Sequence, residues 1–174
     1  MSYRASIIKS IQTGTLTLSS VQTTNTATIT AVVVNNSVMQ LSWTTQATNS
    51  SAAAVSLVLT NSTTLTATRT AHQSSTLDIQ YTVIEFYGSV LRQAVQSFSI
   101  SLGSGTSTNT ATITSVTTTK AAILPTGYTQ DTAAAFRPDY TFAYLTLTNA
   151  TTVTATRQQT TGTTVVTGMV VEFK

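Results

Sequence analysis

The sequence contains the same series of short motifs twice. The heptapeptide TNTATIT occupies residues 24–30 and again residues 108–114, an offset of 84. Further along, LTNSTTLTATR at residues 59–69 returns as LTNATTVTATR at residues 147–157, an offset of 88. Because the motifs follow one another in the same order, we interpret the chain as a tandem duplication in which each copy is one structural unit.

These matches also set the boundaries of the two copies. The motif VIEF ends the first copy at Phe86, and its counterpart VVEF ends the second copy at Phe173. The chain of 174 residues leaves about 85 residues per copy, enough for a small core of modest stability. We therefore expect an N-terminal arm at residues 1–5, a first β repeat at 6–86, a joint at 87–89 and a second β repeat at 90–174.

Alternation of threonine with apolar residues is the dominant local pattern, as in TLTL at residues 15–18 and LTAT at residues 65–68. This period of two and the branched Cβ of threonine favour half-exposed strands. The chain holds 42 Thr and 20 Ser but only 7% charged residues, so hydroxyl groups take the place of charges on the predicted surface. We expect an all-β fold of two tandem repeats, each a small antiparallel β-sandwich or barrel of about six short strands.

Two kinds of connection are predicted between these strands. Residues 61–62 and 149–150 each begin with Asn between two alternating runs, and Asn tolerates left-handed backbone, so we expect a hairpin at each. The alanine triplets at residues 52–54 and 133–135 are long enough for one helical turn only.

Residues 125–140 are the most irregular part of the chain. They hold both prolines, two of the five acidic residues and three aromatic residues. We expect an inserted long loop here, with a contact surface for another subunit or, alternatively, a flap that packs on its own repeat. Its candidate contact residues are Tyr128, Phe136, Arg137 and Tyr140.

Four charged residues occupy equivalent places in the two copies. Arg69 corresponds to Arg157, and Glu85 corresponds to Glu172. Although paired carboxylates suit glycosidase chemistry, the duplication explains this pair. We predict two structural ion pairs between strands, Arg69 with Glu85 and Arg157 with Glu172.

The inventory of reactive side chains is small. His72 is the single histidine and is expected on an exposed loop, and the chain has no cysteine. Asp131 and Asp139 lack the spacing of a calcium loop, so we expect both in solvent. The sequence therefore predicts no catalytic site, no metal, no cofactor and no enzymatic activity.

The charge pattern bears on partners. The net charge is +3, but the eight Lys and Arg residues are spread singly, which disfavours nucleic-acid binding. No apolar run is long enough to span a membrane, and the N-terminus shows no secretion signal. We expect synthesis in the cytoplasm and no membrane partner.

The N-terminal segment has two interpretations that the sequence leaves open. Its apolar and basic side chains favour either an arm that adds to the sheet edge of a neighbour or the first strand of the chain's own sheet. Candidate contact residues in this segment are Tyr3, Arg4, Ile7 and Ile8.

Together, the opening IKSIQTGTLTL at residues 8–18, the TATIT strand, the LTNATTVTATR hairpin and the closing VVEF resemble a Thr-rich β module of virion structural proteins in tailed bacteriophages. The resemblance covers nearly the whole chain. It implies a non-enzymatic protein on the capsid surface of the virion, most often a capsid decoration or cement protein. The implied partner is the major capsid protein of the phage, and self-association as a dimer or trimer is expected by analogy.

An alternative hypothesis places the chain in a phage tail, fibre or adhesin. Exposed aromatic residues such as Tyr128, Tyr140 and Tyr144 would then contact a host glycan or protein. The sequence alone does not separate this role from capsid decoration.

Overall fold

The computed structural model of the chain describes residues 6–131 and 135–174. These residues form twelve strands and four one-turn helical segments, joined by loops. Every strand pairing is antiparallel, so the predicted all-β fold is confirmed. In the first half the elements are β1 (Ile8–Leu18), β2 (Thr24–Thr28), η1 (Val34–Asn36), β3 (Ser37–Thr45), α1 (Ser50–Ala53), β4 (Ser56–Asn61), β5 (Thr64–Thr68) and β6 (Leu77–Phe86). In the second half they are β7 (Gln96–Leu102), β8 (Thr108–Thr112), η2 (Thr118–Lys120), β9 (Ala121–Gln130), α2 (Pro138–Thr141), β10 (Tyr144–Asn149), β11 (Thr152–Thr156) and β12 (Thr164–Glu172).

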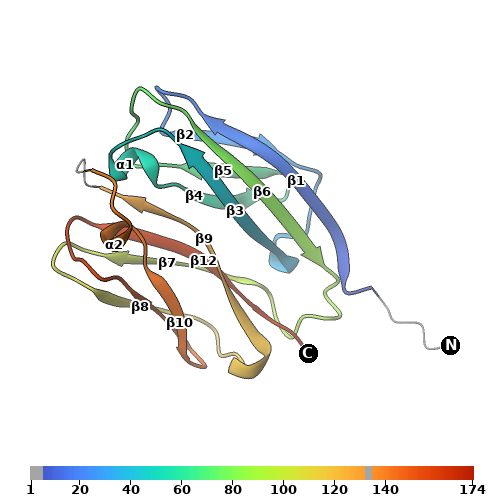
Figure 1. Ribbon diagram of the computed structural model, residues 1–174. Coiled ribbons are helices and arrows are strands. Elements are labelled where there is room, and N and C mark those ends of the chain that lie inside the picture. Colours follow the sequence, from blue (N-terminus) through green and yellow to red (C-terminus); the bar gives the residue numbers. More distant parts are fainter. Residues whose placement is uncertain (1–5, 132–134) are drawn as a thin grey trace.

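The two halves have the same order of elements, which supports the interpretation of a duplication. Polar contacts recur as well. The side-chain amide of Gln12 pairs with the backbone N–H and C=O of Thr30, and Gln96 pairs in the same way with Thr114. Figure 1 shows the first half, blue to green, above the second half, yellow to red.

Each half is a sandwich of two three-stranded sheets. In the first half β1-β6-β3 faces β2-β5-β4, and in the second half β7-β12-β9 faces β10-β11-β8. The predicted alternation is visible in β6, where Leu77, Ile79 and Val83 are buried and the intervening Asp78 and Gln80 are exposed. Inward apolar side chains thus fill each core, and outward threonines cover the sheets.

The two predicted hairpins form, but the role of asparagine differs from the prediction. β4 pairs with β5, and β10 pairs with β11. The Oδ1 atom of Asn61 accepts a hydrogen bond from the N–H of Thr63 at 2.9 Å, and Asn149 accepts one from Thr151 at 2.8 Å. Among the described residues only glycines have positive φ, so these asparagines stabilise the turns through their side chains and not through left-handed backbone.

One strand contact joins a sheet of the first half to a sheet of the second. Ser56 of β4 pairs with Gly127 of β9, and this contact makes one six-stranded sheet in the order β2-β5-β4-β9-β12-β7. The N–H of Tyr128 donates to the carbonyl oxygen of Val55 at 2.9 Å. Gly127 has φ +126°, and a Cβ at this position would lie 2.2 Å from that same oxygen. The close backbone approach therefore requires glycine.

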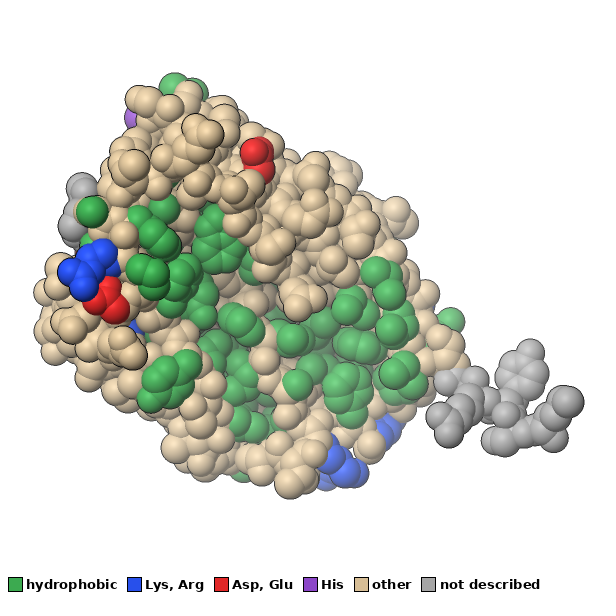
Figure 2. All heavy atoms as spheres, viewed as in Figure 1, with side chains coloured by type: hydrophobic (Ala, Val, Ile, Leu, Met, Phe, Trp, Pro, Cys, Tyr) green, Lys and Arg blue, Asp and Glu red, His purple; other side chains and the backbone are tan. Residues whose placement is uncertain are grey.

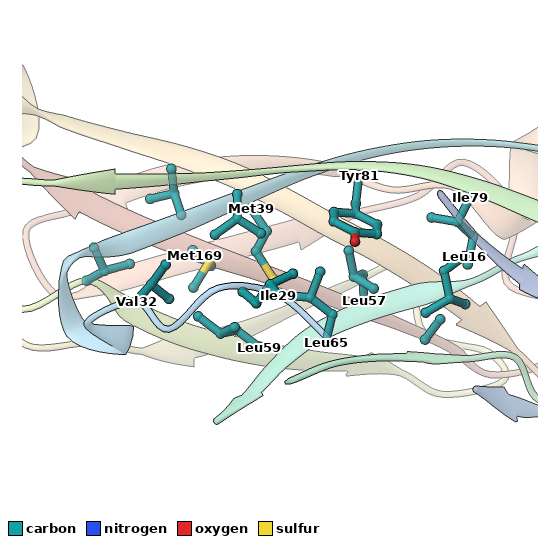
Figure 3. Close-up of a cluster of buried hydrophobic side chains, with 14 of the residues drawn as sticks. Leu16, Ile29, Val32, Met39, Leu57, Leu59, Leu65, Ile79, Tyr81 and Met169 are labelled. Carbon is teal, nitrogen blue, oxygen red and sulfur yellow. The ribbon is translucent and has the colours of Figure 1, made fainter. Parts of the chain in front are cut away.

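The halves also share a hydrophobic core. Val166 and Val170 of β12 belong to the core of the second half, whereas Met169 and Val171 lie in the core of the first half. Figure 3 shows Met169 within this cluster, with Met39 among its neighbours. β12 is therefore buried between two cores, and the chain is one continuous structure rather than two beads.

The fold corrects the sequence expectation for residues 125–140. The irregular segment 125–140 is only partly a loop, because residues up to Gln130 belong to β9 and Pro125 lies at a bulge opposite Gly168. The second one-turn helix is α2 at Pro138–Thr141, while the expected turn at 133–135 falls largely outside the described residues.

We predict that Gly127→Ala weakens the joint between the halves. Alanine would have to adopt a left-handed φ and its methyl group would collide with β4, so we expect the free energy of unfolding to fall by about 2 kcal/mol or more. Chemical denaturation measures this change. Gly103→Ala is the matched control, because no heavy atom lies within 4 Å of a Cβ there. Equal stability of the two variants would contradict the proposed constraint.

Candidate binding surface

Two neighbouring hollows share Phe142, whose ring contacts Trp43 of the first half. The first, which we call the β3 hollow, has a volume of about 590 Å³. The second, which we call the β10 hollow, has a volume of about 720 Å³. In Figure 2, hydrophobic side chains gather in a band between the two halves. The described surface therefore has an apolar recess at the joint, where exposed apolar area often marks a contact site.

An aromatic cluster forms the wall between the hollows. The ring of Phe142 lies 6.2 Å from Trp43, 5.1 Å from Tyr128 and 5.8 Å from Phe136, measured between ring centroids. Trp43 belongs to the first half, and the other three rings belong to the second. These tilted and edge-on contacts hold the rings in place across the joint.

Two of the rings are also fixed by hydrogen bonds. The indole N–H of Trp43 donates to the carbonyl of Ala53 at 2.8 Å, and the hydroxyl of Tyr128 donates to the carbonyl of Ala143 at 2.9 Å. Burial raises the pKa of Tyr128, so its hydroxyl stays protonated and remains a donor. The aromatic wall is thus pre-organised.

The β3 hollow runs along the edge of a sheet. Its lining includes five consecutive residues of β3, Leu41–Thr45, together with Ala53, Phe136 and Phe142. β3 is the terminal strand in the order β1-β6-β3. Backbone groups on the outer side of such a strand are suited to pair with an added strand.

Three of the contact residues expected from the long loop line the hollows. Phe136 lies in the β3 hollow, and Tyr128 and Arg137 lie in the β10 hollow. The loop is held against the first half, since the N–H of Phe136 donates to the carbonyl of Thr48 at 2.7 Å.

Tyr140 does not form part of this surface. It is 5% exposed, and its hydroxyl donates to the carbonyl of Ala135. The guanidinium of Arg137 lies 5.9 Å from the centre of its ring. Tyr140 therefore packs beneath the segment and supports it.

The N-terminal candidates lie elsewhere. Ile7 is 56% exposed, whereas Ile8 packs against the first core, and Tyr3 and Arg4 fall outside the described residues. Ile8 pairs with Phe86, while Trp43 pairs with Ile79. These points are seven residues apart along β6, about 24 Å, so the structure does not bring the segment to the hollows.

Sequence reasoning missed Trp43 and Phe142 and gave Tyr144 only as an example. Comparing the two copies position by position would have identified Phe142 and Tyr144. At the offset of 88, Phe142 replaces Ala54 and Tyr144 replaces Ser56. Large aromatic residues stand in one copy where small ones stand in the other.

The predicted pairs Arg69–Glu85 and Arg157–Glu172 are wrong. Arg69 is 1% exposed and donates to the carbonyl oxygens of Ser19, Gln22, Ala52 and Ser75. Ser19 follows the last residue of β1, whereas Glu85 pairs near its start with Ser10. Nine residues of strand, about 30 Å, separate the two charges.

Arg157 repeats this arrangement in the second half. Its guanidinium donates to the carbonyls of Gly103, Thr106, Tyr140, Thr161 and Gly162 and to the hydroxyl of Thr164. Each arginine therefore ties together a β-turn, a one-turn helix and the loop before the last strand of its half. We call this arrangement the arginine clasp.

The two glutamates stabilise the opposite end of each sandwich. Glu85 pairs with Lys9 at 2.8 Å and accepts hydrogen bonds from the N–H of Val33 and the hydroxyl of Ser10. Glu172 lies 3.5 Å from Arg92 and accepts hydrogen bonds from the N–H of Thr117 and the amide of Gln93. Burial alone would raise the pKa of both carboxyls, but these partners hold each below its ordinary value.

The remaining candidates from the sequence are accounted for. His72 is exposed, and Asp139 pairs with Arg137 at 2.6 Å. Across residues 6–131 and 135–174 there is no group of three or more His, Cys, Asp and Glu side chains placed to hold a metal ion. The same residues include no helix with the length and apolar character needed to cross a membrane.

Comparisons with models of known families, with curated proteins and with solved structures give no match.

We predict that Arg69→Lys destabilises the protein strongly. A lysine has three donors on one nitrogen and cannot serve four carbonyls that Arg69 reaches from three nitrogens, so we expect the free energy of unfolding to fall by about 2–4 kcal/mol. The exposed Arg92→Lys is the control and should change the unfolding midpoint little. Coincident denaturation curves for the two variants would refute the clasp.

We predict that acid destabilises the protein through Glu85 and Glu172. Folding lowers the pKa of both carboxyls, so the unfolded chain binds protons more tightly than the folded one. The two carboxylates therefore stabilise the fold fully above the ordinary pKa of 4.5, and this stabilisation is lost as the pH falls through their lower folded pKa values. Glu85→Gln should flatten the dependence of unfolding free energy on pH below about 5. Denaturation at a series of pH values tests this, and an unchanged slope would count against it.

Proposed function

We propose that the chain is a non-enzymatic structural protein of a tailed-bacteriophage virion, bound to the capsid surface as a decoration protein. Its partner is the major capsid protein. The observation that carries the proposal is the β3 hollow, a pre-organised aromatic recess along the open edge of a sheet. The resemblance of the repeated Thr-rich motifs supports the same role.

The chemistry of the β3 hollow suits an extended segment of another protein. Backbone groups of β3 are available for strand addition, and Trp43, Phe136 and Phe142 receive an apolar side chain. Main-chain pairing supplies affinity, and the aromatic wall supplies selectivity. This type of contact needs no catalytic group and no cofactor.

The joined halves suit a protein that bridges subunits. The six-stranded sheet and the shared core fix two similarly built sandwiches relative to each other. A rigid body loses little conformational freedom when it contacts two neighbours at once. Since only 7% of residues are charged, attachment should depend weakly on salt. Self-association as a dimer or trimer is part of the same proposal.

The copy number of the chain in purified particles tests the proposal. Quantitative mass spectrometry gives its ratio to the major capsid protein in virions of the phage that encodes it. A ratio of one, or a simple fraction of it, supports decoration of the lattice. A handful of copies would favour the tail or fibre instead, and complete absence would overturn the virion role.

We predict that Phe136→Ala reduces attachment to particles that lack the protein by at least about tenfold, because the ring forms one wall of the β3 hollow. Cosedimentation with such particles measures the bound fraction, and circular dichroism checks the fold. Tyr87→Ala is the control. Tyr87 is 44% exposed and lies in the segment that connects the two halves, just after the end of β6, whereas Trp43 of the hollow pairs with Ile79 near the start of β6. Equal attachment of both variants would place the contact elsewhere.

A further inference from the structure

The β10 hollow has no equivalent in the first half. There, Ser56 of β4 pairs with Gly127, so the corresponding edge is covered by β9. In the second half β10 is the terminal strand in the order β10-β11-β8. Tyr144 stands in the place of Ser56 and is 65% exposed. Tyr144 lines the hollow together with Tyr128 and Phe142, so it belongs to an aromatic patch of the kind that marks a contact site.

The lining of the β10 hollow combines aromatic and polar groups. Tyr128, Phe142 and Tyr144 supply ring surface, and Arg137, Asp139 and Gln158 supply donors and acceptors. Arg137 and Asp139 are joined by two hydrogen bonds, of 3.2 and 2.6 Å. The carboxylate is only 24% exposed, so this pair holds a defined orientation.

The matching positions of the first half carry small or short polar side chains, with no aromatic ring and no ion pair. At the offset of 88, Ala54, Asn49 and Ser51 stand where the second half has Phe142, Arg137 and Asp139, and Thr70 stands where it has Gln158. The first half keeps the same arginine clasp and hairpin without these side chains. Phe142 also packs on Trp43 across the joint, but the clasp and the hairpin do not require Arg137, Asp139 or Gln158, and the presence of these three in one half only indicates a separate use.

We propose that the β10 hollow binds a neutral sugar ring of an oligosaccharide. One face of a pyranose is made of C–H groups, which pack on an aromatic ring such as Tyr144. The hydroxyl groups at its edge donate to the carboxylate of Asp139 and accept from the guanidinium of Arg137 and the amide of Gln158. The volume of about 720 Å³ lies in the range of small-molecule sites.

Charge balance favours a neutral sugar over an ion. Arg137 and Asp139 neutralise each other, and the guanidinium of Arg157 is turned to backbone carbonyls. Arg157 keeps its positive charge, but it is 3% exposed and all three of its guanidinium nitrogens already donate to protein oxygens, so it offers no donor to a phosphate. The described lining holds no unpaired carboxylate to select an ammonium group. The β3 hollow, in contrast, is lined by no charged side chain, so the two hollows suit different partners.

Saturation-transfer NMR with the methyl glycosides of glucose, galactose, mannose and N-acetylglucosamine tests the proposal. We expect saturable binding of at least one glycoside, with a dissociation constant of about 0.1–10 mM. Tyr144→Ala should weaken it at least about tenfold by removing the stacking surface. Because Tyr144 is exposed, the variant should fold normally, and circular dichroism verifies this.

Asp139→Asn is the second variant and should also weaken binding, because it replaces an ionised acceptor by a neutral amide. Tyr87→Ala should leave binding unchanged. Absence of binding to all four glycosides, or binding that survives Tyr144→Ala, would overturn the proposal. This inference does not depend on the virion role, since Tyr144→Ala should attach to particles as well as the parent chain does.

Discussion

The close contact between the backbones of β4 and β9 is the constraint on which the rest of the structure depends. Gly127 lets the two strands approach until the N–H of Tyr128 reaches the carbonyl of Val55. That approach turns two three-stranded sheets into one of six strands and brings Met169 into the core of the first half. Two halves that would each be small cores of modest stability thereby bury more apolar surface together.

A chain with few charges uses them where backbone groups lack strand partners. The guanidinium of Arg69 satisfies carbonyls of a β-turn, a one-turn helix and a loop at one end of its sandwich, and the carboxylate of Glu85 satisfies an N–H at the other end. Arg157 and Glu172 do the same in the second half. Within the threonine-covered sheets, backbone N–H and C=O groups pair with those of the neighbouring strand and need no charged partner. These buried charges thus bind backbone groups of irregular segments, where unpaired polar groups would otherwise be costly.

Local patterns predicted the strands and hairpins, because alternation and asparagine turns depend on neighbouring residues. They failed where the outcome depends on distant ones. Arg69 and Glu85 are close in the sequence but lie at opposite ends of the sandwich, since strand direction decides which residues meet. Pro125 and Gly127 signal a loop locally, yet here they shape a bulge and a joint within β9. The Trp43–Phe142 contact was not foreseen because it exists only once the halves are docked.

The joint also explains why the two halves diverged. Joining them uses the outer edge of β4 in the first half and the outer edge of β9 in the second, which leaves β3 and β10 as terminal strands beside the joint. Each copy therefore loses one of its four sheet edges to the contact. Small residues suffice at Ser56, where a strand covers the edge, whereas Tyr144 and Phe142 occupy the uncovered counterpart. An asymmetric joint between similar halves thus creates two unlike recesses, and this asymmetry permits two different binding roles in one fold.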